Sequence, residues 1–269
     1  MELFRSVLLG VIQGLTEFLP VSSSGHLALL PTIFRIEAPT LALAMSLHLG
    51  TLIAVVIYFY KDVINLVQSF FSIFKKERNS KEKKYLKLLI LILVAIIPAV
   101  IFGVLFSDKV DQTFSKPRIV SVLFILNALL LFSAHLYSEK GYVSLENAGF
   151  KNAVLVGLFQ VFALLPGISR SGSTISGGIF SKLRKEDSAR FSFLISVPVV
   201  LGGALFEMKD LFKGTSQNHS VIYIFVGFFV SFLVGLISIR LLFNMLKKSK
   251  LYFFAVYCLI IGIIGLIFS

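Results

Sequence analysis

The chain has 269 residues, of which 57% are hydrophobic and 15% are charged, and its mean hydropathy is +0.90. Soluble domains carry about 25% charged residues, so this composition excludes an ordinary water-soluble protein. The apolar residues come in uninterrupted blocks of about 20, the length that crosses a hydrocarbon layer about 30 Å thick. We therefore expect an all-α integral membrane protein, because a helix satisfies its own backbone hydrogen bonds in lipid.

The net charge of +12 is typical of a membrane protein whose basic residues gather in short loops on the inner side of the membrane. We therefore expect no nucleic-acid partner. Cys258 is the only cysteine, which excludes an intrachain disulfide and a thiolate metal cluster. The first apolar stretch carries Gln13 and Glu17 and has no small-residue cleavage site, so we expect it to stay in the mature protein.

Six blocks are long and apolar enough to be full transmembrane helices. In chain order they are Thr40–Tyr60, Tyr85–Phe106, Ile119–Tyr137, Phe191–Phe206, Val221–Phe243 and Leu251–Phe268. The fourth block is short, so its helix is expected to begin in the basic loop that precedes it. The segment Val63–Phe74 is too short to cross and is predicted to lie at the membrane surface.

Two further apolar stretches, Leu3–Phe34 and Asn152–Phe180, are interrupted in the middle by polar residues. The first break reads Pro20-Val-Ser-Ser-Ser-Gly-His26 and the second reads Pro166-Gly-Ile-Ser-Arg-Ser-Gly-Ser-Thr174. Each stretch is predicted to form a re-entrant helical hairpin, which enters and leaves the membrane on one side.

Residues 61–84 carry seven Lys or Arg against three Asp or Glu, so this loop is predicted to face the cytoplasm. The other crossings then place the hairpin within residues 3–34 on the outer side and the hairpin within residues 152–180 on the cytoplasmic side. If both interrupted stretches were full crossings, the basic loop 182–190 would stay on the cytoplasmic side only with compensating changes elsewhere in the topology. Re-entrant hairpins need no such changes.

The two halves resemble each other. Gly10-Val-Ile-Gln13 matches Gly157-Leu-Phe-Gln160, and Ser22-Ser-Ser-Gly25 matches Ser169-Arg-Ser-Gly172. Each half is one hairpin followed by three crossings, and because three is odd the second half must be inverted in the membrane. We expect a single membrane domain, 1–269, built from inverted repeats at about 1–140 and 148–269, with its site where the broken elements meet.

The first break carries groups suited to phosphoryl chemistry. An acid in an apolar run, such as Glu17, is expensive in lipid and indicates function, although an ion pair with Arg170 would also explain it. Ser22, Ser23 and Ser24 follow a helix-breaking proline, and at least one of them is expected to cap the next helix. Ser, His26 and Glu17 within ten residues form a candidate nucleophile, acid/base and orienting group.

The second break carries Arg170, whose planar fork fits two phosphate oxygens at once. Hydroxyl groups and glycines around it offer further donors to an anion. The candidate phosphate-binding residues are Gln13, Ser22, Ser24, Gly25, Ser169, Ser171, Gly172, Ser173 and Thr174.

His48 lies within a predicted crossing, and a role in the site and a role in packing are equally supported. No zinc spacing, phosphate-binding loop or dinucleotide fingerprint occurs. Two phosphate-binding breaks in lipid fit an amphiphile with a phosphorylated head group.

In these two breaks the chain resembles the bacterial undecaprenyl pyrophosphate phosphatase family, also called the bacitracin-resistance protein family. The segments that carry the resemblance are Gln13-Gly-Leu-Thr-Glu17-Phe-Leu-Pro-Val-Ser-Ser-Ser-Gly-His26 and Pro166-Gly-Ile-Ser-Arg-Ser-Gly-Ser-Thr174. The segment Ala189-Arg-Phe-Ser-Phe193 also matches, and the resemblance covers the whole chain. It implies removal of the terminal phosphate of undecaprenyl pyrophosphate at the outer face of the bacterial plasma membrane, which recycles the lipid carrier for cell-wall synthesis.

The resemblance also implies roles: Ser23 the nucleophile, His26 the acid/base, Glu17 its carboxylate partner and Arg170 the phosphate clamp. The family has Glu or Gln at position 13, and this chain has Gln13. Glu17 is then the one candidate ligand for a divalent cation such as Mg²⁺ or Ca²⁺, so metal dependence stays open. A homodimer and direct attack by water stay open as well.

The type-2 phosphatidic-acid phosphatases share Ser-Gly-His and Ser-Arg, but they need a second His, with an Asp four residues on, soon after Ser-Arg. No such pair follows Arg170 here, so that class is rejected. The alternative from another class is a lipid-phosphate flippase or transporter built on the inverted repeat. A transporter needs no nucleophile, so the Ser, Glu and His of the first break favour the enzyme.

Overall fold

The computed structural model describes residues 2–34, 39–212 and 221–269, and their regular structure is helical, with one isolated bridge between Val143 and Leu183. The α-helices are α1 (Glu2–Phe18), α2 (Ser23–Phe34), α3 (Leu41–Tyr58), α4 (Tyr60–Phe71), α5 (Ser80–Phe114), α6 (Pro117–Tyr137), α7 (Phe150–Phe162), α8 (Arg170–Phe180), α9 (Lys185–Phe212), α10 (Val221–Lys247) and α11 (Tyr252–Phe268).

Among the described residues, five helices are long and apolar enough to cross a membrane, namely α3, α5, α6, α9 and α10. The sixth predicted crossing forms α11, an apolar helix of 17 residues that is shorter than these. Large apolar side chains cover the outside of the molecule: Val104 is 76% exposed and Ile267 is 72% exposed. A surface this apolar is stable only against lipid, so the chain is a multi-pass membrane protein.

Two helices are longer than the apolar blocks from which they were predicted. The helix predicted from Tyr85 begins at Ser80, because the Asn79 side chain accepts from the Glu82 N–H and the Glu82 carboxylate accepts from the Asn79 N–H. It continues to Phe114 with a kink at Phe106, where the backbone leaves the helical region. The helix predicted from Phe191 begins at Lys185, inside the basic loop, as expected.

The short segment after α3 forms the helix α4, and its place at the membrane surface stays a prediction. In α4 the polar Asp62 and Ser69 are buried, whereas Ile64, Val67 and Phe71 are exposed. An amphipathic helix whose apolar face points outward is typical of one that lies along a membrane surface.

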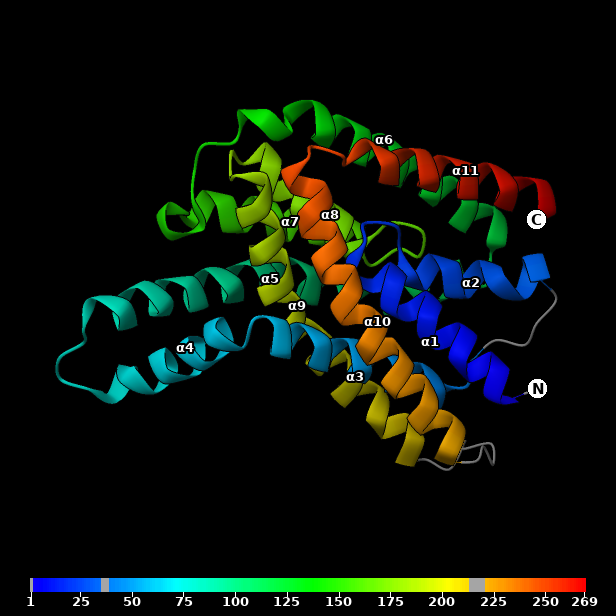
Figure 1. The fold of residues 1–269 in the computed structure, drawn as a ribbon, viewed down its shortest axis with the longest axis horizontal. Coiled ribbons are helices and arrows are strands. Elements are labelled where there is room, and N and C mark those ends of the chain that lie inside the picture. Colours follow the sequence, from blue (N-terminus) through cyan, green and yellow to red (C-terminus); the bar gives the residue numbers. More distant parts are fainter. Residues whose placement is uncertain (1, 35–38, 213–220) are drawn as a thin grey trace.

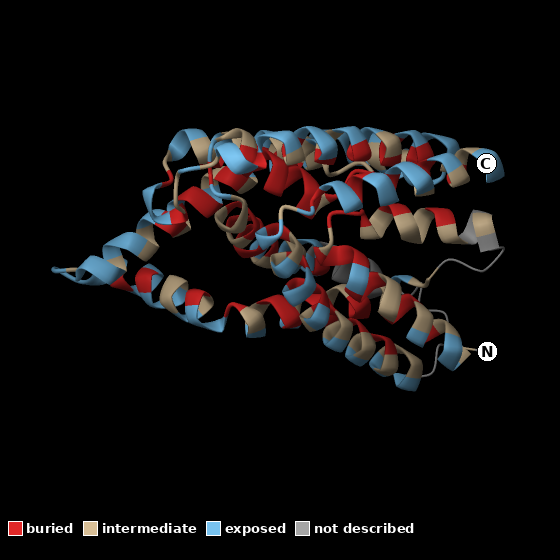
Figure 2. Ribbon diagram, turned by 45° about the horizontal axis from the view of Figure 1, so that its top comes forward, coloured by how far each residue is buried: buried red, intermediate tan, exposed pale blue. Residues whose placement is uncertain are grey.

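The helices form two groups, and the two polar breaks of the apolar stretches lie between these groups (Figure 1). Helix α11 packs along α6 in one group, and α1, α3 and α10 pack together in the other. The α1–α2 pair doubles back on itself, so that the start of α1, the end of α2 and the C-terminus lie at one side of the molecule. The turn between α4 and α5 projects from the opposite side, and buried residues concentrate where the two groups meet (Figure 2).

Three loops converge on the side away from the termini. The Lys185 ammonium donates to the Glu139 carboxylate and to the Ser249 hydroxyl, which joins the segments after α6, before α9 and after α10. In the same region Lys84 at the start of α5 pairs with Glu146 and holds the pKa of that carboxyl below its ordinary value. The basic loops predicted to share one side of the membrane therefore do lie together.

Small residues allow α3 and α10 to pack closely. A Cβ added to Gly50 would overlap the Ser231 side chain and the Phe228 carbonyl oxygen of α10, whereas one added to Gly202 would have no atom within 4 Å. We expect Gly50→Ala to lower the free energy of unfolding by roughly 1–3 kcal/mol through this overlap. Thermal unfolding in detergent measures it, with Gly202→Ala as the matched control, and equal midpoints for the two variants would contradict this packing.

Candidate functional site

The first break turns the chain sharply between α1 and α2. Ser22 adopts a left-handed backbone conformation (φ 68°), which is unusual for a residue other than glycine and asparagine. Its Oγ accepts a hydrogen bond from the Gly25 N–H at 3.2 Å, so Ser22 caps the new helix. Ser23 is consequently the first residue of α2, with free backbone N–H groups beside it.

In the second break, too, a serine caps the helix that follows. Gly167 takes a positive φ of 105°, which suits glycine, and Ser169 Oγ accepts from the Gly172 N–H at 3.1 Å as the N-cap of α8. Arg170 is then the first residue of α8. Ser23 and Arg170 therefore hold equivalent positions at two helix N-termini, which favour an anion between them.

Direct hydrogen bonds tie the two breaks together. Ser22 Oγ also accepts from the Gly167 N–H at 3.1 Å. Gly25 comes so close that an added Cβ would lie 2.8 Å from the Gly167 Cα. Gly25, which was predicted to bind phosphate, thus allows close backbone contact between the breaks.

Asn127, in the middle of α6, bridges both breaks and was missed by the sequence reasoning. Its Nδ2 donates to the Pro20 carbonyl at 3.1 Å, and its Oδ1 accepts from the Ser169 N–H at 3.2 Å. The side chain is fully buried. A lone amide within an apolar crossing was the available signal, because a polar residue in a crossing must find a partner.

We expect Asn127→Ala to lower the free energy of unfolding by about 2 kcal/mol or more, because it leaves the Ser169 N–H buried without its acceptor. The Pro20 carbonyl then keeps only the weak thiol donor of Cys258, at 3.8 Å. The measurement is thermal unfolding in detergent. Ser133→Ala is the control, because exposed Ser133 on the same helix bonds only to the carbonyl of Leu129, one turn earlier. A similar, small shift in both variants would show that the bridge contributes little.

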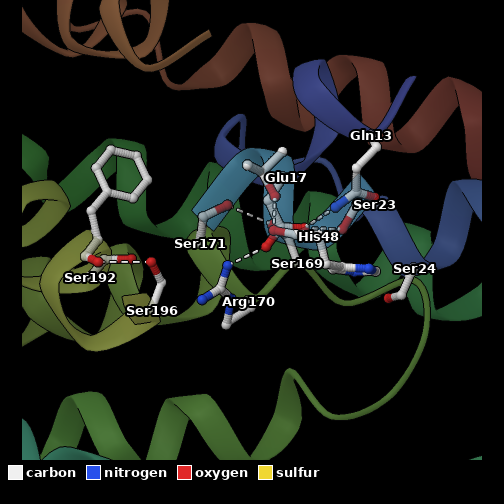
Figure 3. A network of polar contacts seen from close by, with 12 residues as sticks. Gln13, Glu17, Ser23, Ser24, His48, Ser169, Arg170, Ser171, Ser192 and Ser196 are labelled. Carbon is white, nitrogen blue, oxygen red and sulfur yellow. Dashed lines mark hydrogen bonds and ion pairs between the residues drawn. The ribbon is translucent and has the colours of Figure 1, made fainter. Parts of the chain in front are cut away.

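The Glu17 carboxylate, near the end of α1, is the centre of the site (Figure 3). Its Oε2 accepts from Ser23 Oγ at 2.7 Å and from Gln13 Nε2 at 3.0 Å, and its Oε1 accepts from Arg170 Nη2. The ion pair that the sequence left open as a role for Glu17 is therefore formed. Glu17 is buried, so its charge requires these donors.

Arg170 keeps part of its donor set free. Its Nη1 is buried and has no hydrogen-bond partner among the described residues. A buried guanidinium N–H without a partner is costly and indicates a missing acceptor. The residue lines a cavity of about 40 Å³, and the cavity is enclosed by Thr16, Glu17, Ser22, Ser23, Ser24, Ala163, Ser169 and Arg170. This space holds several water-sized groups, which suits a phosphoryl group and its oxygens.

Other predicted site residues surround the cavity without lining it. The Ser171 hydroxyl donates to the Leu19 carbonyl at 3.2 Å, and Thr174 donates to the Arg170 carbonyl and contacts Ser192 of α9. Ser173 Oγ is buried and has no hydrogen-bond partner in the described part of the chain. Gly172 serves the cap described above, and Thr16 and Ala163 were not predicted as lining residues.

The two predicted histidines lie in different surroundings. His26 Nδ1 donates to the Ser22 carbonyl at 2.7 Å, and its Nε2 accepts from the Tyr257 hydroxyl at 2.8 Å. Both ring nitrogens thus have partners, and neither partner is Ser23. His48, on α3, donates from Nδ1 to the Ala44 carbonyl at 2.9 Å, and Figure 3 shows its ring beside the Glu17–Ser23 pair.

The donor set does not match a metal site. In the part of the chain that the structure describes, no group of three or more His, Cys, Asp or Glu side chains clusters as metal ligands would. Glu17 is the one carboxylate that lines the cavity, and its oxygens already accept from Ser23, Gln13 and Arg170.

Comparison with known proteins identifies the family. Residues 6–264 match the family described as bacitracin resistance protein BacA. The chain belongs to this family. BacA relatives named undecaprenyl-diphosphatase include those of Methanosphaera stadtmanae and Alkaliphilus metalliredigens, each 39% identical, and that of Geotalea daltonii, 38% identical. The alignments cover 100% of this chain and 98–99% of the relatives. The matched range includes both breaks that the structure joins around Glu17 and Arg170.

Proposed function

We propose that this protein is an undecaprenyl-diphosphatase, which hydrolyses the terminal phosphate of undecaprenyl diphosphate to give undecaprenyl phosphate and phosphate. The observation that carries the proposal is the Ser23 hydroxyl bonded to the Glu17 carboxylate, in a cavity lined by an arginine with an unused N–H. The names of the full-length relatives agree with it.

The chemistry follows from the positions of three side chains. Arg170 and the amides at the starts of α2 and α8 bind the terminal phosphate and neutralise the charge that builds up on it. Ser23 Oγ attacks the phosphorus as Glu17 accepts the hydroxyl proton across the 2.7 Å hydrogen bond. The bond to the lipid monophosphate breaks, and water then releases phosphate from the phosphoserine.

The proposal includes a topology in which α1–α2 and α7–α8 are re-entrant and the site opens to the outer face of the plasma membrane. Two observations support it. The basic segment 61–84 projects from the side opposite both termini (Figure 1). The loops joined through Lys185 lie together on the side away from the termini. Positive charge then faces the cytoplasm, and the α1–α2 hairpin opens outward.

We also propose that residues 1–140 and 148–269 are inverted repeats. The matched glycines support this. An added Cβ on Gly10 would contact Val230 of α10, and one on Gly157 would contact Ala95 of α5. Helices α5 and α10 occupy equivalent places, each being the second crossing after the hairpin of its half.

Phosphate release from undecaprenyl diphosphate by protein purified in detergent tests the function. Hydrolysis is expected there, because catalysis does not require two compartments, whereas a flippase without hydrolysis would release none. A parallel reaction with a chelator measures any requirement for Mg²⁺ or Ca²⁺. Absence of phosphate release in both reactions and after addition of these cations would contradict the proposal.

A further inference from the structure

His48 supplies a titratable group beside the catalytic carboxylate, and it comes from a helix that carries neither signature break. It lies on α3, which packs against α1. Its half-buried ring is close enough to the Glu17 carboxylate to interact with it electrostatically, and Figure 3 shows it near that carboxylate.

The hydrogen bond of His48 fixes its tautomer. The Ala44 carbonyl can only accept, so Nδ1 carries a proton, and in the neutral imidazole the lone pair is then on Nε2. No hydrogen bond among the described residues uses that lone pair, which leaves an oriented base at the site. His26 differs because the Tyr257 hydroxyl occupies its Nε2.

The hydrogen bonds around Glu17 limit its strength as a base. Glu17 accepts from Ser23, Gln13 and Arg170, and three donors stabilise the charged form and weaken it as a base. An imidazole is better matched to proton transfer near neutral pH. Gln13 occupies the position one turn before Glu17 and provides an amide, which cannot take up a proton.

We propose that His48 is the proton-transfer partner of Glu17 in this reaction, an inference that rests on the proposed phosphatase function. As Ser23 Oγ bonds to the terminal phosphorus, the P–O bond to the lipid monophosphate breaks and its electron pair leaves with that product. The hydroxyl proton passes through Glu17 to Nε2 of His48. When water then attacks phosphorus and the Oγ–P bond breaks, one water proton returns to Ser23 and the other stays on phosphate. The imidazolium releases its proton to solvent.

The test compares wild type, His48→Gln and His48→Ala in the detergent assay. Glutamine keeps a polar side chain of similar reach but cannot accept the proton, so kcat should fall about 100-fold while KM changes little. Free imidazole should restore the rate of His48→Ala at least tenfold, a response that a merely structural role would not produce. His135→Gln is the matched control, because His135 lies near the end of α6 with its ring against Tyr252. Folded protein is quantified by size-exclusion chromatography before each assay.

A His48→Gln variant with kcat within twofold of wild type overturns the inference and leaves the phosphatase function intact. The inference is also overturned if free imidazole raises the rate of His48→Ala by no more than it raises the rate of the wild type. Failure of the wild type itself to release phosphate would instead overturn the function proposed above.

Discussion

Replacement of Arg170 by alanine should lower kcat/KM for phosphate release from undecaprenyl diphosphate by about 10³-fold. Phosphoryl transfer depends on positioning and charge neutralisation more than on covalent chemistry, and an arginine at the transferred phosphate is worth about 10³–10⁵ in rate. Arg170 is well placed for this role because it begins α8, lines the cavity and keeps Nη1 free. Arg170→Lys should recover only part of the loss, because an ammonium lacks the planar fork.

The same substitution also removes the partner of a buried carboxylate, so a loss of folded protein must be separated from a loss of catalysis. Breaking a buried ion pair from one side is destabilising by about 3–5 kcal/mol. Pairing Arg170→Ala with Glu17→Gln removes both charges, which should restore much of the unfolding midpoint without restoring activity. Arg240→Ala, at an exposed arginine on α10, serves as the control for loss of a positive charge. A folded Arg170→Ala protein with most of its activity would show that the phosphate is held elsewhere.

Much of the fold is readable from the sequence because lipid imposes strict length and polarity rules on a helix. The long apolar helices, the short helix α4 and the two breaks all follow from those rules. Helix ends were missed where polar contacts outside the apolar block decide them, as at Asn79, which starts α5 five residues before the predicted Tyr85. The crossing of the membrane by α11, the number of crossings and the inverted repeat stay predictions.

The site residues were predictable where a polar side chain interrupts an apolar stretch of the sequence. Glu17, Ser23 and Arg170 stand out as polar residues in apolar surroundings, and the structure brings them together. The partners of His26 could not be predicted, because Tyr257 comes from a helix 231 residues away in sequence. Asn127 was overlooked for the same reason: its importance depends on two loops that meet only in three dimensions.

Glu17→Gln should lower kcat by about 10²–10⁴-fold, the range expected for loss of a general base. KM should stay level or fall, because a neutral amide competes less than a carboxylate for Arg170 and leaves the guanidinium to the substrate. Glutamine preserves the size of the side chain and an oxygen for the Ser23 hydroxyl, so the shape of the break is retained. Steady-state kinetics in detergent measure the two constants separately, and equal losses in kcat for Glu17→Gln and the exposed-site variant Glu146→Gln would contradict the assignment.

Ser23→Ala completes this test because nucleophile and base act as one unit. If Ser23 Oγ attacks phosphorus, its removal should be about as damaging as Glu17→Gln, and the double variant should be little worse than either single one. Ser22→Ala makes a poor control because Ser22 holds the two breaks together, whereas Ser133→Ala alters an exposed hydroxyl far from the cavity. Near-normal turnover of Ser23→Ala, with Glu17→Gln still inactive, would assign the attack to a water molecule activated by Glu17. Additive losses would mean that the two side chains act in separate steps, and the 2.7 Å hydrogen bond between them would then not be the path of the proton.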